Sequence, residues 1–373
     1  TPLPSTTLFR SAKILLERGV TRVAGDLVVD DTIFESAWIH PQWPGNQHAS
    51  WYRAPVGGLN FNDNCVDIVI KPAGRGGHRA IIEMTPPAPH MTVINNTVTG
   101  QGKTPVVWRD PDQDKYIFTG QCSKPVTLQS VAVHDPGLLA GWACKSAFAK
   151  AGVVIDGTVI RRRILASDNS LPLQSTVVAT HSATMTDVIM RCNKRSQNLF
   201  AECLFKTLAL TEHGALAVGT GSQSTTQPIP PEGNWMAGSQ AVSALLARLG
   251  ADPAEFRVID GSGLSHDNRM SPRVLSRILL RGVAMNDPRA TTLFINSLPI
   301  AGVDGSLKRK LNHPRLVGKI KAKTGSLNGV SALSGYADSP NGPVVFSMLF
   351  NKTYKSNQVP KAQQDICLKL LCQ

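Results

Sequence analysis

Residues 320–351 carry the sequence IKAKTGSLNGVSALSGYADSPNGPVVFSMLFN, which decides how the C-terminal part of the chain folds. Apolar and polar residues alternate along it, and Gly325, Gly329 and Asn341-Gly342 interrupt the alternation. This pattern predicts strands separated by tight turns, followed by a helix. The predicted strands cover residues 320–324, 331–337 and 343–351, and the predicted helix covers residues 361–371. We therefore expect an antiparallel meander closed by a C-terminal helix, an α+β arrangement.

The tetrapeptide Lys323-Thr324-Gly325-Ser326 lies where the first of these strands is predicted to end. It places an ammonium group and a hydroxyl group where they can meet a carboxylate lying along the strand. Gly325 lets a ligand approach the backbone closely, and the backbone N–H of Ser326 can point at a developing oxyanion. The alternative interpretation is an exposed turn without a ligand.

A second polar cluster, Ser196-Gln197-Asn198, lies at a predicted helix start beside Lys194 and Arg195. The pattern Ser-x-Asn has little weight alone, because Ser167-Asp168-Asn169 also fits it and is interpreted as an ordinary turn. Ser196 is equally compatible with a plain helix N-cap. Two nearby acidic residues are interpreted as cap or ion-pair residues rather than catalysts: Asp187 and Glu202.

Length and composition describe a globular protein. The chain has 373 residues, 42% of them hydrophobic, and a formal net charge of +13. This length predicts two or three domains, and no apolar run is long enough to span a bilayer. The basic clusters are short and no nucleic-acid-binding motif accompanies them. We therefore expect no nucleic-acid partner, and an anionic cell-envelope surface fits the charge equally well.

The seven cysteines form no CxxC motif and the histidines are scattered, so we expect no structural zinc. Cys65 and Cys122 lie in strand-like sequence and could pair in an oxidising compartment. Three further cysteines follow helical patterns, where a small buried apolar residue is the preferred interpretation: Cys144, Cys192 and Cys203.

The N-terminal half contains a weak internal repeat. A helix over residues 5–17 precedes a strand over 23–30, and a helix over 137–151, capped by His134-Asp135-Pro136, precedes a strand over 153–160. The two units share a Gly between helix and strand, which suggests one α/β subdomain split by the sequence between them. That intervening sequence predicts strands at residues 65–71, 79–84, 105–108 and 125–133. After residue 174 the pattern changes to helices, at residues 186–190, 198–210, 235–249 and 271–284.

Five segments occur in a fixed order along the chain. They are GDLVVDDTIF (residues 25–34), NKRSQNLFAE (193–202), DGSGLSHDNR (260–269), LPIAGVDGSL (298–307) and KTGS (323–326). With this set the chain closely resembles the class C low-molecular-mass penicillin-binding proteins. These are the DacB-type D-alanyl-D-alanine carboxypeptidase/endopeptidases of peptidase family S13. The resemblance covers essentially the whole chain.

The resemblance implies a penicillin-recognising, serine transpeptidase/β-lactamase-like domain that carries large insertions. Residues 1–55 and 125–174 would form an inserted α/β domain, and residues 56–124 an inserted β-rich domain. Residues 175–373 would form the C-terminal portion of the catalytic domain. It also implies a periplasmic or extracytoplasmic enzyme without metal or organic cofactor.

The implied reaction is serine acyl transfer on the D-Ala-D-Ala end of peptidoglycan stem peptides, with β-lactams as inhibitors. The implied catalytic residues are Ser196, which relays a proton, Asn198, which holds the substrate amide, and Lys323, which supplies positive potential. The implied substrate-binding residues are Thr324, for the terminal carboxylate, Gly325, and Ser326, whose N–H shares the oxyanion hole.

The first motif of that family, Ser-x-x-Lys, is absent, because no serine of this sequence has a lysine three positions later. In the family it precedes the GDLVVDDTIF segment, so we expect the nucleophile upstream of residue 1. Two other interpretations stay open. One is a non-catalytic peptidoglycan-binding homologue, and the other, less favoured because of the large insertion, is a β-lactamase.

Overall fold

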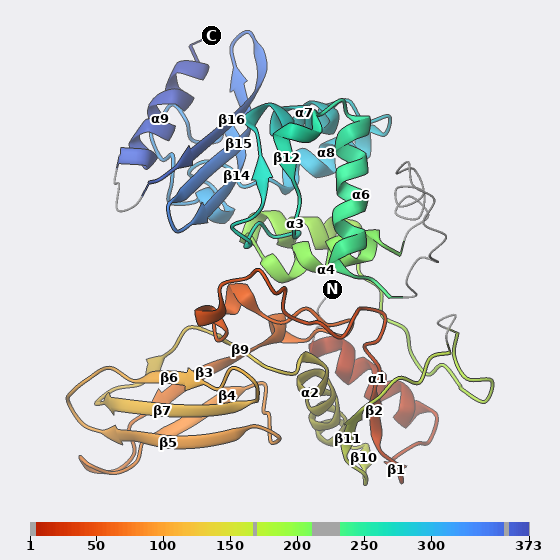
Figure 1. Ribbon diagram of the computed structural model, residues 1–373. Helices are drawn as coiled ribbons and strands as arrows, with labels where there is room; N and C mark the ends of the chain where they lie inside the picture. Colours follow the sequence, from red (N-terminus) through yellow and green to blue (C-terminus); the bar gives the residue numbers. More distant parts are fainter. Residues whose placement is uncertain (1–4, 167–169, 211–231, 354–357, 373) are drawn as a thin grey trace. The chain divides into compact units, whose positions relative to one another are not determined.

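A computed structural model describes residues 5–166, 170–210, 232–353 and 358–372 (Figure 1). The Ser167-Asp168-Asn169 turn expected from the sequence lies outside these residues. The chain divides into two compact units. Unit 1 comprises Thr1–Ser182 with Ile229–Asn234, and unit 2 comprises Ala183–Pro228 with Trp235–Gln373. Among the described residues, no helix is both long and apolar enough to cross a membrane.

The two predicted helix–strand units of unit 1 pair with each other. Strand β1 pairs in parallel with β10, and β2 pairs in parallel with β11, while α1 contacts α2. The elements are α1 (Ser5–Glu17), β1 (Arg22–Val23), β2 (Leu27–Val29), α2 (Pro136–Ala151), β10 (Val154–Ile155) and β11 (Val159–Arg161). Helix α2 is capped at its start by Asp135, whose carboxylate accepts from the Leu138 N–H at 2.9 Å, and at its end by Gly152. Each strand predicted as continuous is two short strands here.

The rest of unit 1 is β-rich. Strand β3 pairs with β4, β8 and β9, and a separate sheet has the order β5–β7–β6. These strands are β3 (Cys65–Lys71), β4 (Ile81–Thr85), β5 (Thr92–Thr99), β6 (Val106–Arg109), β7 (Lys115–Cys122), β8 (Val126–Thr127) and β9 (Val131–Ala132). Three-residue 3-10 turns lie at Gly45–Gln47, Trp51–Arg53 and Asn62–Asn64. The single strand predicted over 125–133 is wrong: β8 and β9 are separate pairings with β3.

Unit 2 begins with helices and ends with the predicted meander. Its elements are α3 (Met185–Arg195), α4 (Asn198–Leu208), α6 (Trp235–Arg248), a 3-10 turn (Pro253–Glu255), β12 (Phe256–Arg257), β13 (Arg269–Met270), α7 (Pro272–Val283), α8 (Pro288–Ser297), η5 (Gly305–Leu307), β14 (Ile320–Leu327), β15 (Val330–Ser339), β16 (Gly342–Asn351) and α9 (Gln358–Leu370). Ser271 caps α7 by accepting from the Val274 N–H at 3.2 Å. Helix α3 extends to Arg195, beyond the predicted residues 186–190.

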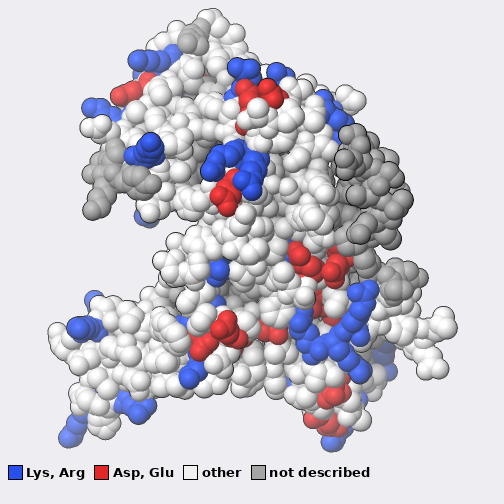
Figure 2. Space-filling view, viewed as in Figure 1, with Lys and Arg blue, Asp and Glu red and all other residues white. Residues whose placement is uncertain are grey.

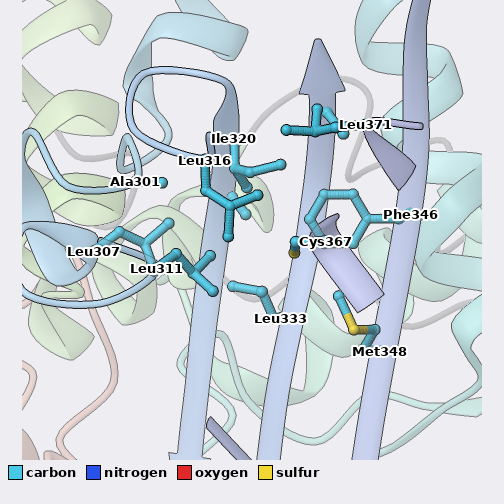
Figure 3. Close-up of a cluster of buried hydrophobic side chains, with 12 residues drawn as sticks. Ala301, Leu307, Leu311, Leu316, Ile320, Leu333, Phe346, Met348, Cys367 and Leu371 are labelled. Atoms are coloured by element: carbon cyan, nitrogen blue, oxygen red, sulfur yellow. The ribbon is translucent and has the colours of Figure 1, made fainter. Parts of the chain in front are cut away.

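The antiparallel sheet β14–β15–β16 has α9 against one face and α7 against the other (Figure 1). On the α9 face, a cluster of buried side chains fills the space between sheet and helix (Figure 3). It includes Ile320, Ala322, Leu333, Phe346, Met348, Cys367 and Leu371. Because side chains alternate along a strand, Ile320 and Ala322 on this face leave Lys321 and Lys323 on the opposite face.

Strand β14 forms one edge of this sheet. The segment 299–301 covers the first part of that edge, where the Ala322 N–H donates to the Pro299 carbonyl at 2.9 Å and the Ala301 N–H donates to Ile320. Beyond Ala322, no further strand of the described residues pairs with this edge. The backbone of residues 323–327 is therefore available to a ligand that lies along the strand.

All seven cysteines are free thiols. Cys65 and Cys122, the pair considered for a disulfide, are both buried and unlinked. Cys203 is buried as the helical pattern predicts, whereas Cys144 and Cys192 are half-buried.

Replacing a buried side chain of the sheet should destabilise the protein far more than replacing an exposed one. Leu333 is 1% exposed and Leu280 of α7 is 53% exposed. We expect Leu333→Ala to lower the free energy of unfolding by about 2–5 kcal/mol because it leaves a cavity. Leu280→Ala should change it by about 0.5 kcal/mol or less. Urea denaturation measures both, and equal losses would contradict the burial of Leu333 in the core.

Candidate active site

Two polar side chains from distant parts of unit 2 meet at the edge of β14. The Lys323 Nζ donates to the Ser196 Oγ at 2.6 Å and to the Thr324 carbonyl at 2.8 Å. Lys323 comes from β14, whereas Ser196 comes from the turn between α3 and α4. The sequence predicted both residues as catalytic candidates, and the structure brings them into contact.

Ser196 is held in an unusual backbone conformation. It is the C-cap of α3, with φ 53° and ψ 48°, in the left-handed region. The next residue, Gln197, donates its N–H to the Cys192 carbonyl at 3.0 Å and is the N-cap of α4. Ser196 is therefore not the start of a helix, as the sequence suggested, but the residue that ends one helix just before another begins. From this sharp turn the Ser196 hydroxyl reaches the Lys323 ammonium of β14.

The C-terminal end of α3 is anchored to the segment that covers β14. The Lys194 Nζ donates to the Leu298 carbonyl at 2.6 Å and pairs with the Asp304 carboxylate at 2.7 Å. One residue earlier, the Asn193 amide donates to the Ser297 hydroxyl at 2.7 Å. These contacts fix α3 against the same segment that pairs with β14. They therefore set the distance between Ser196 and Lys323.

The other predicted site residues lie beside this pair. The Thr324 Oγ1 is 2.8 Å from the Ser306 Oγ, and Gly325 and Ser326 are exposed at the open part of the β14 edge. Asn198 is half-buried at the first position of α4, two residues after Ser196. The sequence offered Ser306 no role, and only its position in the LPIAGVDGSL segment singles it out.

Burial is the main electrostatic influence on Lys323. It lowers the pKa of this ammonium group, because a charged group loses solvation when it is buried. The Cys192 thiol acts in the opposite direction, and the positive charge of Lys310 lowers the pKa of Lys323 further. The Lys323 ammonium group thus lies beside the Ser196 hydroxyl in a partly desolvated position. Electrostatic interactions there are stronger than in water.

A cavity of about 640 Å³ adjoins β14 on the side of Thr324. Its lining includes Thr324, Gly325 and Ser326 together with three basic residues, Arg309, Lys310 and Lys361. Elsewhere on the face seen in Figure 2, Lys and Arg side chains form several separate groups. The basic lining of the cavity favours a ligand with negative charge near Thr324.

The DGSGLSHDNR segment forms a self-bonded loop. The Asp260 carboxylate accepts from the N–H groups of Gly263 and Ser265, both at 2.7 Å. Gly261 has no room for a side chain, since a Cβ there would lie 2.6 Å from the Ala201 carbonyl of α4. The loop is therefore a structural turn that packs closely on α4. His266 within it is exposed.

Glu202 of α4 is the polar anchor for that loop. It is fully buried and accepts from the Gly261 N–H at 3.1 Å, the Ser262 N–H at 2.7 Å and the Trp235 indole at 2.8 Å. Burial, with the nearby Asp260 charge, raises the pKa of its carboxyl group. The sequence interpretation of Glu202 as a cap or ion-pair residue missed this role. Asp187 is part of the α3 cap, where it accepts from the Thr184 hydroxyl at 2.7 Å.

Comparison with known proteins identifies the family. The model of the D-Ala-D-Ala carboxypeptidase 3 (S13) family matches residues 3–372. The chain belongs to this family.

Among the described residues, no group of three or more His, Cys, Asp or Glu side chains could hold a metal ion.

The relatives agree with this assignment. The chain is 30% identical over 365 residues to a D-alanyl-D-alanine carboxypeptidase of an Actinomadura species, with 93% of this chain and 63% of that protein covered. It is 25% identical over 354 residues to the D-alanyl-D-alanine carboxypeptidase DacB of Haemophilus influenzae, covering 92% and 68%. The chain thus spans about two thirds of the length of these relatives.

The fold is that of a solved relative. The crystal structure of penicillin binding protein 4 (dacB) from Haemophilus influenzae superposes with a TM-score of 0.76. At 24% identity the match covers 98% of this chain and 79% of that chain. A second structure of the Haemophilus protein, with a TM-score of 0.70 and 23% identity over 98% and 78% of the two chains, is complexed with a β-lactam. The expected α+β, penicillin-recognising fold is confirmed.

The left-handed conformation of Ser196 predicts an unusual order of stability between two variants. A non-glycine residue in this region costs roughly 1–2 kcal/mol, and glycine does not bear that cost. We expect Ser196→Gly to be more stable than Ser196→Ala by about 1 kcal/mol, although both lack the hydroxyl. Urea denaturation of the two variants measures the difference. A more stable alanine variant would contradict the assigned backbone conformation.

Proposed function

We propose that the protein is a serine-type D-Ala-D-Ala carboxypeptidase and D,D-endopeptidase that acts on peptidoglycan stem peptides through an acyl-enzyme. The observation that carries this proposal is the 2.6 Å contact between the Lys323 ammonium and the Ser196 hydroxyl, beside the open edge of β14. A strand edge can bind an extended peptide, and the cation and hydroxyl beside it can serve acyl transfer. Family membership and the names of the relatives support the same activity.

The nucleophile of this proposed enzyme is not in the chain. No serine is followed by lysine at the third position. We propose that a Ser-x-x-Lys motif lies upstream of Thr1, since the chain spans only 63% and 68% of the two relatives. Experiments on activity therefore use the protein with its upstream segment included.

In the proposed reaction, the upstream serine attacks the carbonyl carbon between the two D-alanines, while its lysine partner takes the serine proton. The C–N bond breaks, and the leaving amine receives a proton through Ser196. The Ser196 Oγ accepts from Lys323, so its own single hydrogen is directed elsewhere. Water then attacks the ester carbonyl, and the ester C–O bond breaks to regenerate the serine. A β-lactam forms the same ester and remains bound.

The remaining roles follow the geometry of β14. Thr324 binds the terminal carboxylate, Gly325 allows the peptide to approach, and the Ser326 N–H shares the oxyanion hole. Asn198, on the turn of α4 next to Ser196, holds the substrate amide. We propose no metal or organic cofactor for this chemistry.

The domain organisation and location belong to the same proposal. Residues 1–55 with 125–174 form an inserted α/β domain, residues 56–124 form an inserted β-rich domain, and residues 175–373 form part of the catalytic domain. We propose a periplasmic or extracytoplasmic location, with peptidoglycan stem peptides and β-lactam antibiotics as ligands.

Removing the side chain of either Ser196 or Lys323 should slow acylation strongly. We expect Ser196→Ala and Lys323→Ala to lower the rate of labelling by a fluorescent penicillin by about 100-fold or more, the usual range for a lost proton-transfer group or charge donor. The rate is measured on the protein with its upstream segment. Labelling reactions are quenched at successive times and the labelled protein is quantified by gel fluorescence.

Lys321→Ala is the matched control. Lys321 lies on the same face of β14 but contacts Asn296 instead, at 3.3 Å, so labelling should be nearly unchanged. Near-normal labelling of Ser196→Ala and Lys323→Ala would refute the site. If even the unaltered protein takes up no penicillin but binds stem peptides, it is a non-catalytic peptidoglycan-binding protein instead.

The charge of Lys323 also predicts a pH dependence. Acylation should fall as the pH rises through the pKa of Lys323, which burial and Lys310 hold below the ordinary lysine value. Lys310→Gln removes a like charge, so it should raise that pKa and move the fall to higher pH. The pH profile of the acylation rate measures the shift, with Lys308→Gln as the control for an exposed neighbour. A shift to lower pH would contradict the assignment.

A further inference from the structure

Thr324 has a second hydroxyl group beside its own. The Ser306 Oγ lies 2.8 Å from the Thr324 Oγ1, although the two residues are 18 positions apart. Ser306 is in η5 and Thr324 is in β14. We propose that Ser306 is a positioning residue that directs the hydroxyl hydrogen of Thr324 toward the carboxylate of the ligand. This inference rests on the proposed function, in which Thr324 binds that carboxylate.

The argument depends on how many hydrogens the pair can offer. Each hydroxyl has one hydrogen and two lone pairs. If Thr324 donated to Ser306, it would present only lone pairs to an incoming carboxylate, which is itself only an acceptor. If Ser306 donates instead, the hydrogen of Thr324 is available to the carboxylate. A bound carboxylate therefore selects the arrangement in which Ser306 is the donor.

The backbone around Ser306 is fixed, so its hydroxyl is already in place before a ligand binds. The Asp304 carboxylate accepts from the Ile300 N–H at 2.8 Å and from the Lys194 ammonium at 2.7 Å. Gly305 has φ 56°, and a Cβ there would lie 2.8 Å from the Lys194 carbonyl. A residue held in this way loses little further freedom when the ligand arrives.

The residue after Ser306 anchors the turn from the other side. Leu307 is 1% exposed and belongs to the buried cluster between the sheet and α9 (Figure 3). Its carbonyl accepts from the Gly302 N–H at 3.1 Å. Ser306 thus lies between an ion pair to α3 and a side chain in the core. The turn at residues 304–306 therefore does two things. Through Asp304 it anchors the end of α3, next to Ser196, and through Ser306 it places a hydroxyl group beside Thr324.

The test compares two ligands that differ in the carboxylate alone. Benzylpenicillin carries a carboxylate beside its β-lactam ring, and its methyl ester does not. The second-order acylation rate constants for both are measured on the protein with its upstream segment. The ratio of the acid to the ester rate constant then reports carboxylate recognition, and a merely structural loss would lower both rate constants together.

We expect Ser306→Ala to lower this ratio by about tenfold, as for a weakened hydrogen bond to a charged group. Ser306→Thr keeps a hydroxyl and should restore the ratio to within about threefold of the unaltered protein. Ser347→Ala is the matched control, because Ser347 forms another hydroxyl pair, with Ser334 at 2.8 Å, within the same sheet. Its ratio should not change.

Two failures can be told apart. If the unaltered protein is not acylated by benzylpenicillin at all, the proposed function fails and this inference falls with it. If the unaltered protein is acylated and prefers the acid, but Ser306→Ala keeps the full preference, only the inference is overturned. An equal loss for both ligands in Ser306→Ala would also overturn it, since it would indicate a structural effect.

Discussion

The contact between the Lys323 ammonium and the Ser196 hydroxyl depends on a constraint that neither residue supplies alone. One side chain belongs to an edge strand and the other to a turn between helices, so their separation is set by what lies between those elements. Residues 297–306 fill that position. This segment pairs with β14 through Ala322 and holds α3 through Lys194. One attachment is a backbone hydrogen bond to β14 and the other is a set of charge-assisted hydrogen bonds to α3. Together they fix the positions of both β14 and α3 relative to this segment.

The alternation of β14 explains why this arrangement can exist in a stable sheet. Ile320 and Ala322 bury their side chains against α9, so the chain can place Lys321 and Lys323 on the other face without losing its core. Thr324 returns to the α9 side, where Ser306 meets it. The strand therefore presents an ammonium group from one face and a hydroxyl from the other, next to the open edge between them. A single strand residue could not present both groups.

Sequence patterns predicted those parts of the fold whose signals are local. The meander and the capped helices α2 and α7 follow from alternation and from Asp135 and Ser271. Strand β5 escaped prediction because two asparagines stand at its centre. The Asn95 side-chain amide donates to the carbonyl of Ala80, just before β4, at 2.7 Å, and its oxygen accepts from the Thr97 N–H at 3.0 Å. Helix α8 contains Thr291, Thr292 and Ile295, β-branched residues of low helix propensity, although Asp287 caps its start.

The sequence predicted which residue types form the site, but not the backbone turn and the buried contacts that hold them in place. Lys323 and Ser196 stand in short motifs, whereas the left-handed turn at Ser196 gives no sign in the sequence, because serine is not the residue that such a conformation favours. The sequence also gives no sign that Glu202 is buried, because a glutamate in an amphipathic helix is ordinarily exposed. Here it ties Trp235 and the loop at Gly261 and Ser262 to α4. A buried carboxylate with three donors costs desolvation but immobilises the helix that begins at Asn198, and that rigidity is what a proton relay at the adjoining turn requires.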